Sequence, residues 1–189
     1  MQWSLENDGT FPSWNLGIAD ADIDMEAAWD ITQGSSSVTV GILDTGLKLD
    51  HPEFEDRIWT NWSELDDGID NDGNGFIDDL SGWDFVNEDN DPYDDQGHGT
   101  SVGGILGATG NNSIGYAGID WNCRLMSLKI LNENNSGYYS WWTDAIYYAT
   151  NNGANILNMS VGGSSFSNSM EVAVDYAHAS GVTIFACMM

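Results

Sequence analysis

Short apolar runs alternate with helical segments along this chain, and this alternation constrains the fold more than any other feature. The runs are β-branched or aliphatic, short and bounded, which is typical of buried strands. They predict strands at residues 38–43, 124–131, 154–158 and 182–187. Helices are expected at residues 20–30, 101–108, 139–151 and 167–180, and the last two are followed by glycines that favour a helix end.

Strands that alternate with helices predict right-handed crossovers and an α/β fold, with a parallel β-sheet flanked by helices on both faces. A chain of 189 residues has the length of one ordinary domain, which we expect to extend over residues 1–189. In such sheets, functional sites lie at the carboxyl ends of the strands. The residues that follow each strand are therefore the first to examine.

The charge of the chain excludes several classes of partner. Four Lys and Arg residues stand against 30 Asp and Glu residues, which gives a formal net charge of −26. This balance argues against binding to nucleic acid and to anionic membrane surfaces, because both need clustered cations. The sequence also has no apolar run long enough to span a bilayer, so no membrane span is expected.

The chain has only two cysteines, Cys123 and Cys187. Two are too few for a disulfide framework. Each lies in an apolar, strand-like run, and free cysteines are among the most buried residues. The sequence therefore predicts two buried free thiols.

The first predicted strand ends in Asp44-Thr45-Gly46. An aspartate at the end of a buried strand is well placed to orient an imidazole, although it can also serve only in a turn. The same tripeptide occurs in aspartic proteases, which need a second carboxylate to share a proton. Here it continues into Leu47 and has no second copy, so only a symmetric homodimer could supply that carboxylate.

The second candidate for chemistry is a histidine between two glycines, His98 in Gly97-His98-Gly99. Glycines at a loop-to-helix junction let the backbone approach a substrate closely and let the ring face a cleft. Of the other histidines, His178 lies within a helical segment and His51 precedes a proline in a loop. A strand-end aspartate followed by this histidine predicts the orienter and the base of a nucleophilic triad.

Together these motifs resemble the subtilisin-like serine proteases, or subtilases. The resemblance rests on residues 38–46 (Val-Thr-Val-Gly-Ile-Leu-Asp-Thr-Gly), 51–54 (His-Pro-Glu-Phe) and 97–100 (Gly-His-Gly-Thr). Residues 111–118 are similar to the family's calcium loop, and residues 157–163 to its substrate-lining segment. The resemblance implies a three-layer α/β/α fold and a secreted serine endopeptidase. Its expected partners are a polypeptide substrate and, as a further candidate, its own propeptide.

By this resemblance Asp44 orients His98, which acts first as general base and then as general acid. The family's serine stands in Gly-Thr-Ser, followed further on by Ala-x-Pro, after the last strand recognised here. The only Gly-Thr-Ser in this chain ends at Ser101, within the histidine motif, and the oxyanion asparagine would come just after Met189. We therefore expect a single incomplete catalytic domain, truncated at its C-terminal side and inactive alone, with an apolar groove left open on the sheet.

Two extended segments of a subtilase sandwich the substrate strand through backbone hydrogen bonds, a mode that small residues suit. The resemblance assigns this substrate-binding role to two sets of three residues. They are Ser136, Gly137 and Tyr138 in the first segment, and Ser160, Val161 and Gly162 in the second.

The stretch 60–97 is acidic and rich in glycine and asparagine, and we interpret it as an inserted loop of the calcium-binding type. Thirteen acids fall within residues 64–95, with no Lys or Arg between Arg57 and Arg124. Oxygen ligands recur at alternate positions as in an EF-hand, with Ser81 where the closing Glu should stand. The predicted ligands are Asp70, Asp72, Asn74, the carbonyl of Phe76, and Asp78 or Asp79. The alternative is a loop that is merely solvated.

A second calcium site follows from the resemblance alone. Its ligands would be Glu53, the Asn112 side chain and the carbonyls of Gly110, Ile114 and Tyr116. Calcium is thus expected as a structural cofactor. The competing function is a non-catalytic, calcium-dependent binding or adhesion module on a protease-like fold, which would leave Asp44 and His98 without a role.

Overall fold

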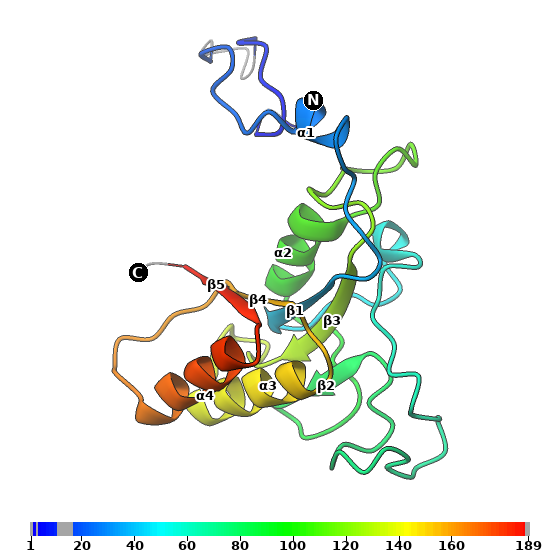
Figure 1. The fold of residues 1–189 in the computed structure, drawn as a ribbon, viewed down its shortest axis with the longest axis vertical. Helices are drawn as coiled ribbons and strands as arrows, with labels where there is room; N and C mark the ends of the chain where they lie inside the picture. The colour runs from blue at the N-terminus through cyan, green and yellow to red at the C-terminus, as the bar shows by residue number, and fades with distance from the viewer. Residues whose placement is uncertain (1, 3, 11–16, 188–189) are drawn as a thin grey trace.

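The computed structural model describes residues 2, 4–10 and 17–187, and a five-stranded sheet forms its centre (Figure 1). The strands are β1 (Thr39–Asp44), β2 (Gly82–Asp84), β3 (Arg124–Lys129), β4 (Ile156–Met159) and β5 (Thr183–Ala186). Their order in the sheet is β2-β3-β1-β4-β5, and all neighbours pair in parallel. The parallel α/β architecture expected from the sequence is confirmed.

Helices cover the two faces of the sheet unequally. They are α1 (Met25–Trp29), the short 3-10 helix η1 (Pro52–Phe54), α2 (His98–Gly107), α3 (Tyr139–Asn151) and α4 (Asn168–Ala179). Figure 1 shows α3 and α4 side by side on one face and α2 on the other. No helix in the described part of the chain has both the length and the apolar character needed to cross a membrane.

The helix expected at residues 20–30 is shorter in the structure. It begins only at Met25, because Asp24 before it has a left-handed backbone with a φ of 53°. The helix expected from Ser101 begins three residues earlier, at His98, directly after Gly97 with a φ of 106°. Both helix starts are therefore set by a residue with positive φ.

One strand was not predicted from the sequence. The segment Gly82–Asp84 lies within the acidic stretch, where only a loop was expected, yet it forms β2 and pairs with Ser127 to Lys129 of β3. Three residues are too few to show a periodic pattern. A Cβ at Gly82 would overlap the carbonyl oxygen of Ser127, so this pairing depends on a glycine.

The central strand β1 is buried along its whole length and separates two apolar clusters. On one side Leu43, Leu128 and Leu157 pack with Ile146 and Ala149 of α3. On the other side Val40, Ile42 and Leu125 pack with Leu47 and Phe54. Burial on both sides holds the carboxyl end of β1 at a fixed position, and that end carries the candidate aspartate.

Helices flank both faces of the sheet as expected, but the α2 side is only partly covered. An apolar groove of about 400 Å³ runs between α2 and strands β4 and β5. Ile105 and Phe185 line it and are 67% and 59% exposed. The open groove expected on the sheet is therefore present, because α2 alone cannot cover the strands on this face.

The two thiols differ in their surroundings. Cys123 is buried, and burial raises its pKa to about 11. Cys187 is exposed, so the prediction of two buried thiols is wrong for this residue. It follows β5, which forms one edge of the sheet and has mostly exposed side chains.

Candidate active site

The carboxyl end of β1 meets the first residue of α2. Asp44 Oδ1 lies 2.7 Å from His98 Nδ1, so the two side chains are within hydrogen-bonding distance, as expected. Asp44 is fully buried, whereas the His98 side chain is 38% exposed. A carboxylate on Nδ1 holds the proton there and leaves Nε2 as the nitrogen available for proton transfer.

The buried Asp44 carboxylate accepts hydrogen bonds through one of its two oxygens. Its Oδ1 also accepts a hydrogen bond from the backbone N–H of Thr45 at 2.8 Å. Among the described residues, none offers a hydrogen bond to its buried Oδ2. Burial raises the pKa of Asp44, and the hydrogen bond from His98 opposes that rise. The His98 ring thus gives this carboxylate a partner that favours its charged form.

The structure shows a packing role for the glycines around His98, in addition to the role expected from the sequence. Gly97 has a φ of 106°, which places it in a conformation that favours glycine. A Cβ at Gly99 would overlap the carbonyl oxygen of Gly46 and would lie 3.1 Å from the Asp44 Cβ. Gly99 therefore lets α2 approach the end of β1, which brings His98 to Asp44.

We expect Gly99→Ala to destabilise the fold by about 1–3 kcal/mol, as overpacking of a close contact does. The matched control is Gly104→Ala in the same helix, where a Cβ meets nothing within 4 Å. This control should be neutral or stabilising by up to about 1 kcal/mol, because alanine is the better helix former. Urea unfolding measures both effects, and equal stability of the two variants would contradict the close approach at Gly99.

A second carboxylate, Asp94, which the sequence did not single out, links the segments that carry the two candidate residues. Asp94 Oδ1 accepts hydrogen bonds from Thr45 Oγ1 at 2.8 Å and from the backbone N–H groups of Gln96 at 3.0 Å and Gly97 at 2.7 Å. Its Oδ2 accepts from the N–H and Oγ1 of Thr100, at 2.9 and 2.5 Å. Burial acts to raise the pKa of Asp94, but hydrogen bonds from Thr100 and Gly97 outweigh it and lower the pKa. Asp94 therefore ties the turn after β1 to the start of α2.

We expect Asp94→Asn to cost about 2–4 kcal/mol at neutral pH, because several bonds to a charged acceptor are weakened together. A carboxylate with a lowered folded pKa stabilises the fold above its unfolded pKa of about 3.9, and that contribution is lost as the pH falls. The difference from the wild type should therefore shrink below about pH 4. Urea unfolding between pH 3 and pH 7 tests this, with the exposed Asp91→Asn as control. A difference that stays constant with pH would contradict a charged role for Asp94.

A buried lysine, Lys129, contacts both the turn after β1 and residues 93–95. Lys129 of β3 is 1% exposed, and its Nζ lies 2.7 Å from Asp95 Oδ1. The same nitrogen donates to the carbonyl oxygens of Thr45 and Tyr93, both at 3.3 Å. Lys129 thus fixes residues 93–95 against the end of β1. The sequence did not reveal this role, because the lysine lies within an apolar run.

The two expected substrate-binding segments line one hollow of about 490 Å³. Ser136 and Gly137 lie on one side, and Ser160, Val161 and Gly162 on the other. Tyr138 is 67% exposed and is not among the lining residues. The hollow also contains Trp142, a residue that the sequence analysis took only as part of a helix. Its Nε1–H is buried and has no hydrogen-bond partner among the described residues.

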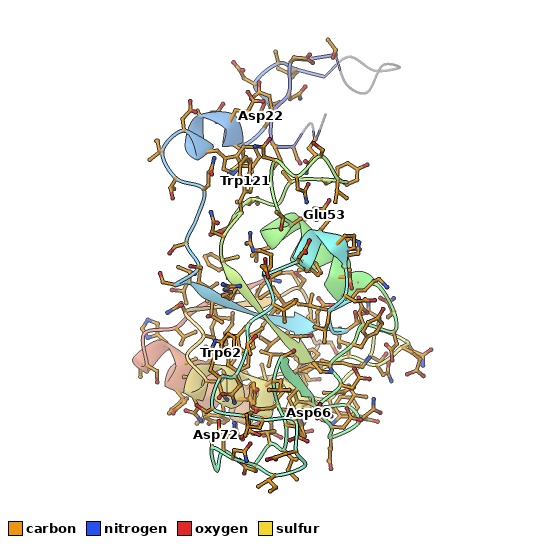
Figure 2. All side chains as sticks on the ribbon, turned by 90° about the vertical axis from the view of Figure 1, so that its right-hand side faces the viewer. Asp22, Glu53, Trp62, Asp66, Asp72 and Trp121 are labelled. Atoms are coloured by element: carbon orange, nitrogen blue, oxygen red, sulfur yellow. The ribbon has the colours of Figure 1, made fainter. Side chains whose placement is uncertain are left out.

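The acidic loop gathers three carboxylates. Oxygens of Glu64, Asp70 and Asp72 lie within 4.8 Å of one another. Glu64 is 3% exposed and precedes the EF-hand-like pattern, so its place in the sequence did not mark it as a ligand. Figure 2 shows Asp72 near the lower end of the molecule, whereas Glu53 and Trp121 lie in its upper half. Any ion bound here is thus separate from one bound at Glu53.

The remaining predicted ligands of this loop have other contacts in the structure. The Asn74 amide donates to Asp72 at 3.3 Å and to Asp79 at 3.0 Å, and its Oδ1 accepts the N–H of Phe76. Asp78 accepts the N–H of Gly68 and lies outside the three-carboxylate group. Asp79 accepts a 2.5 Å hydrogen bond from the Tyr148 hydroxyl, and burial raises its pKa. Asp79 therefore anchors the loop to α3.

The second predicted metal site is centred on a buried Glu53. Its Oε2 accepts from the Asn112 amide and its Oε1 from the N–H of Tyr116, both at 3.0 Å. Ile114 donates its N–H to Asn112 Oδ1, and Gly110 lies against the indole of Trp121. The structure therefore brings Glu53, Asn112 and the 114–116 backbone together.

Comparison with known proteins shows similarity to one protease family. Residues 35–188 match the model of the Subtilase family. The chain is 35% identical over 159 residues to the thermophilic serine proteinase of Bacillus sp. (strain AK1), covering 84% of this chain and 34% of that protein. It is 31% identical over 180 residues to thermitase of Thermoactinomyces vulgaris, covering 95% of this chain and 56% of thermitase. The chain is 36% identical over 155 residues to halolysin of Haloferax mediterranei, covering 80% of this chain and 26% of halolysin. The chain thus spans between about a quarter and about half of these relatives.

Proposed function

The chain belongs to the subtilase family, and from this premise we propose that it supplies the base and the orienting carboxylate of a secreted serine endopeptidase. The observation that carries the proposal is the 2.7 Å contact between Asp44 and His98 at the carboxyl end of β1. An exposed imidazole that is held by a fully buried carboxylate suits general base catalysis. The strongly acidic composition is in keeping with an extracellular setting.

In this mechanism His98 Nε2 removes the proton from a serine hydroxyl as that oxygen attacks the scissile carbonyl. The imidazolium that forms is stabilised by Asp44, and it then gives its proton to the leaving amine. Ser101 is a poor candidate for the nucleophile, because its Oγ donates to the Gly97 carbonyl one turn back in the same helix. We place the serine in a further Gly-Thr-Ser motif, on a segment that packs into the apolar groove beside α2.

The proposed substrate is an extended polypeptide. It would lie between residues 136–137 and 160–162, whose small side chains leave the backbone accessible for strand addition. A propeptide of the same protein is a further candidate for this groove.

We also propose that Ca²⁺ binds at Glu64, Asp70 and Asp72. Three clustered carboxylates are the hard oxygen donors that this ion prefers, and a chain of net charge −26 gains from neutralisation. Glu53 and Asn112 fit a second ion, with carbonyls of Gly110, Ile114 and Tyr116 as further ligands. The ions would hold loops in place and would take no part in the proton transfers.

A serine-directed fluorophosphonate tests the proposed activity. In the full-length protein, the label should attach to one serine outside residues 1–189, and the same preparation should cleave a peptide substrate. The isolated 189-residue chain should do neither. Calcium-dependent peptide binding without labelling or cleavage would overturn the proposal in favour of a binding module. Cleavage by the isolated chain that is lost in His98→Ala would overturn the assignment of the nucleophile.

A further inference from the structure

A second cavity lies on the α3 side of the sheet. It has a volume of about 760 Å³ and is bounded by residues 74–77 of the acidic loop, by β2 and by α3. This volume is in the range of small-ligand sites. The cavity contains neither Asp44 nor His98, and it shares no lining residue with the hollow between the substrate-binding segments.

Aromatic rings from three separate segments form its walls. Phe76 comes from the acidic loop and Trp83 from β2, while Trp141 and Tyr147 come from α3. The Phe76 ring meets Trp83 edge-on at 5.0 Å and Tyr148 at 4.8 Å, so these walls are held by mutual packing. The face of an aromatic ring carries partial negative charge and attracts cations.

The charges at this cavity are of one sign. Its lining includes two carboxylates, Glu88 and Asp144, and no basic side chain among the described residues. Both carboxylates are exposed to solvent; partial burial raises the pKa of Asp144, and no described residue offers it a hydrogen bond or an ion pair. The four basic residues of the chain are engaged elsewhere, namely Lys48 with Asp50, Arg57 with Asp120, Arg124 with the Asp56 carbonyl and Lys129 with Asp95. No cation of this chain is therefore available to fill the cavity.

We propose that this cavity binds an organic cation, a guanidinium or alkylammonium group, between the aromatic rings and the carboxylates of Asp144 and Glu88. An anion would meet two carboxylates, and a neutral apolar ligand would gain nothing from their charge. A divalent metal ion has more suitable oxygen donors in Glu64, Asp70 and Asp72. A planar guanidinium can stack on a ring and pair with a carboxylate at the same time, which favours an arginine-like ligand.

Titration followed by NMR of the tryptophan indole N–H signals tests this site. Ethylguanidinium represents a free cation, and N-acetyl-Gly-Arg-Gly-amide a basic side chain within a peptide. Their neutral counterparts are N-ethylurea and the same peptide with citrulline. We expect the cations to bind with millimolar dissociation constants, at least about five-fold tighter than the neutral probes, and to shift Trp83 and Trp141 but not the exposed Trp62. Each titration is run with excess Ca²⁺ and with EDTA, so that binding to the acidic loop is recognised.

Variants then locate the binding. Trp141→Leu should weaken it about five-fold or more, and Asp144→Asn about three-fold. The matched control is Asp175→Asn on α4, which makes the same change of charge outside this cavity and should leave binding unchanged. If Trp141→Leu does not fold, Tyr147→Leu takes its place. Equal binding of charged and neutral probes, or equal losses in Asp144→Asn and Asp175→Asn, would overturn the proposal.

Discussion

Replacing Asp44 by Asn should lower peptide hydrolysis by the full-length protein about 10⁴-fold, with little change in KM. The reason lies in the 2.7 Å contact between Asp44 and His98 Nδ1. A neutral amide at this position no longer stabilises the imidazolium and no longer selects the tautomer with the proton on Nδ1. The measurement is kcat/KM on a chromogenic peptide at neutral pH.

Two comparisons make this result specific to the proposed pair. Asp50→Asn changes an aspartate that is 72% exposed six residues further on, and it should leave hydrolysis unchanged. His98→Ala should be at least as damaging as Asp44→Asn, and the double variant should be no worse than His98→Ala alone, because the two residues act as a unit. A loss of less than ten-fold in Asp44→Asn, or additive losses in the double variant, would contradict the proposed mechanism.

Removal of calcium should lower the midpoint of thermal unfolding by about 5–10 °C for each site that holds an ion. A ligand present at a hundred-fold excess over its dissociation constant stabilises the folded state by about 2.7 kcal/mol per site. For a domain of this size, each kcal/mol shifts the midpoint by about 2–4 °C. Unfolding scans in EDTA and in excess Ca²⁺ measure the difference.

The role of the three clustered carboxylates, Glu64, Asp70 and Asp72, can be distinguished by mutation from the role of the other acids in the acidic loop. Asp70→Asn should bind calcium more weakly at this loop, because Asp70 is one of the three carboxylates whose oxygens lie within 4.8 Å of one another. The part of the EDTA-induced fall in the unfolding midpoint that comes from this loop should therefore be mostly lost in the variant. Asp66→Asn, an exposed acid of the same loop outside that group, is the control and should behave like the wild type. Equal calorimetric titrations of both variants would show that this loop is only solvated.

Part of the fold was accessible from the sequence because its signals are local. The helix Tyr139–Asn151 has the predicted bounds, since Gly153 shortly after it ends the periodic pattern. The central strands were recognised because burial on both faces requires continuous apolar runs. The edge strand Gly82–Asp84 was missed, because its place in the sheet comes from a contact with Ser127 more than forty residues away.

The sequence by itself determined the chemistry available to this protein, and the tertiary structure decided which groups share a site. Asp44 and His98 stood out through a strand end and a pair of glycines, which are local features. Asp94 and Glu64 did not stand out, because in a stretch with thirteen acids all carboxylates look alike. Only folding buries these two and surrounds them with N–H and hydroxyl donors or with further carboxylates. The physical reason is that burial and hydrogen bonding depend on neighbours in space, and those neighbours come from several elements of the fold.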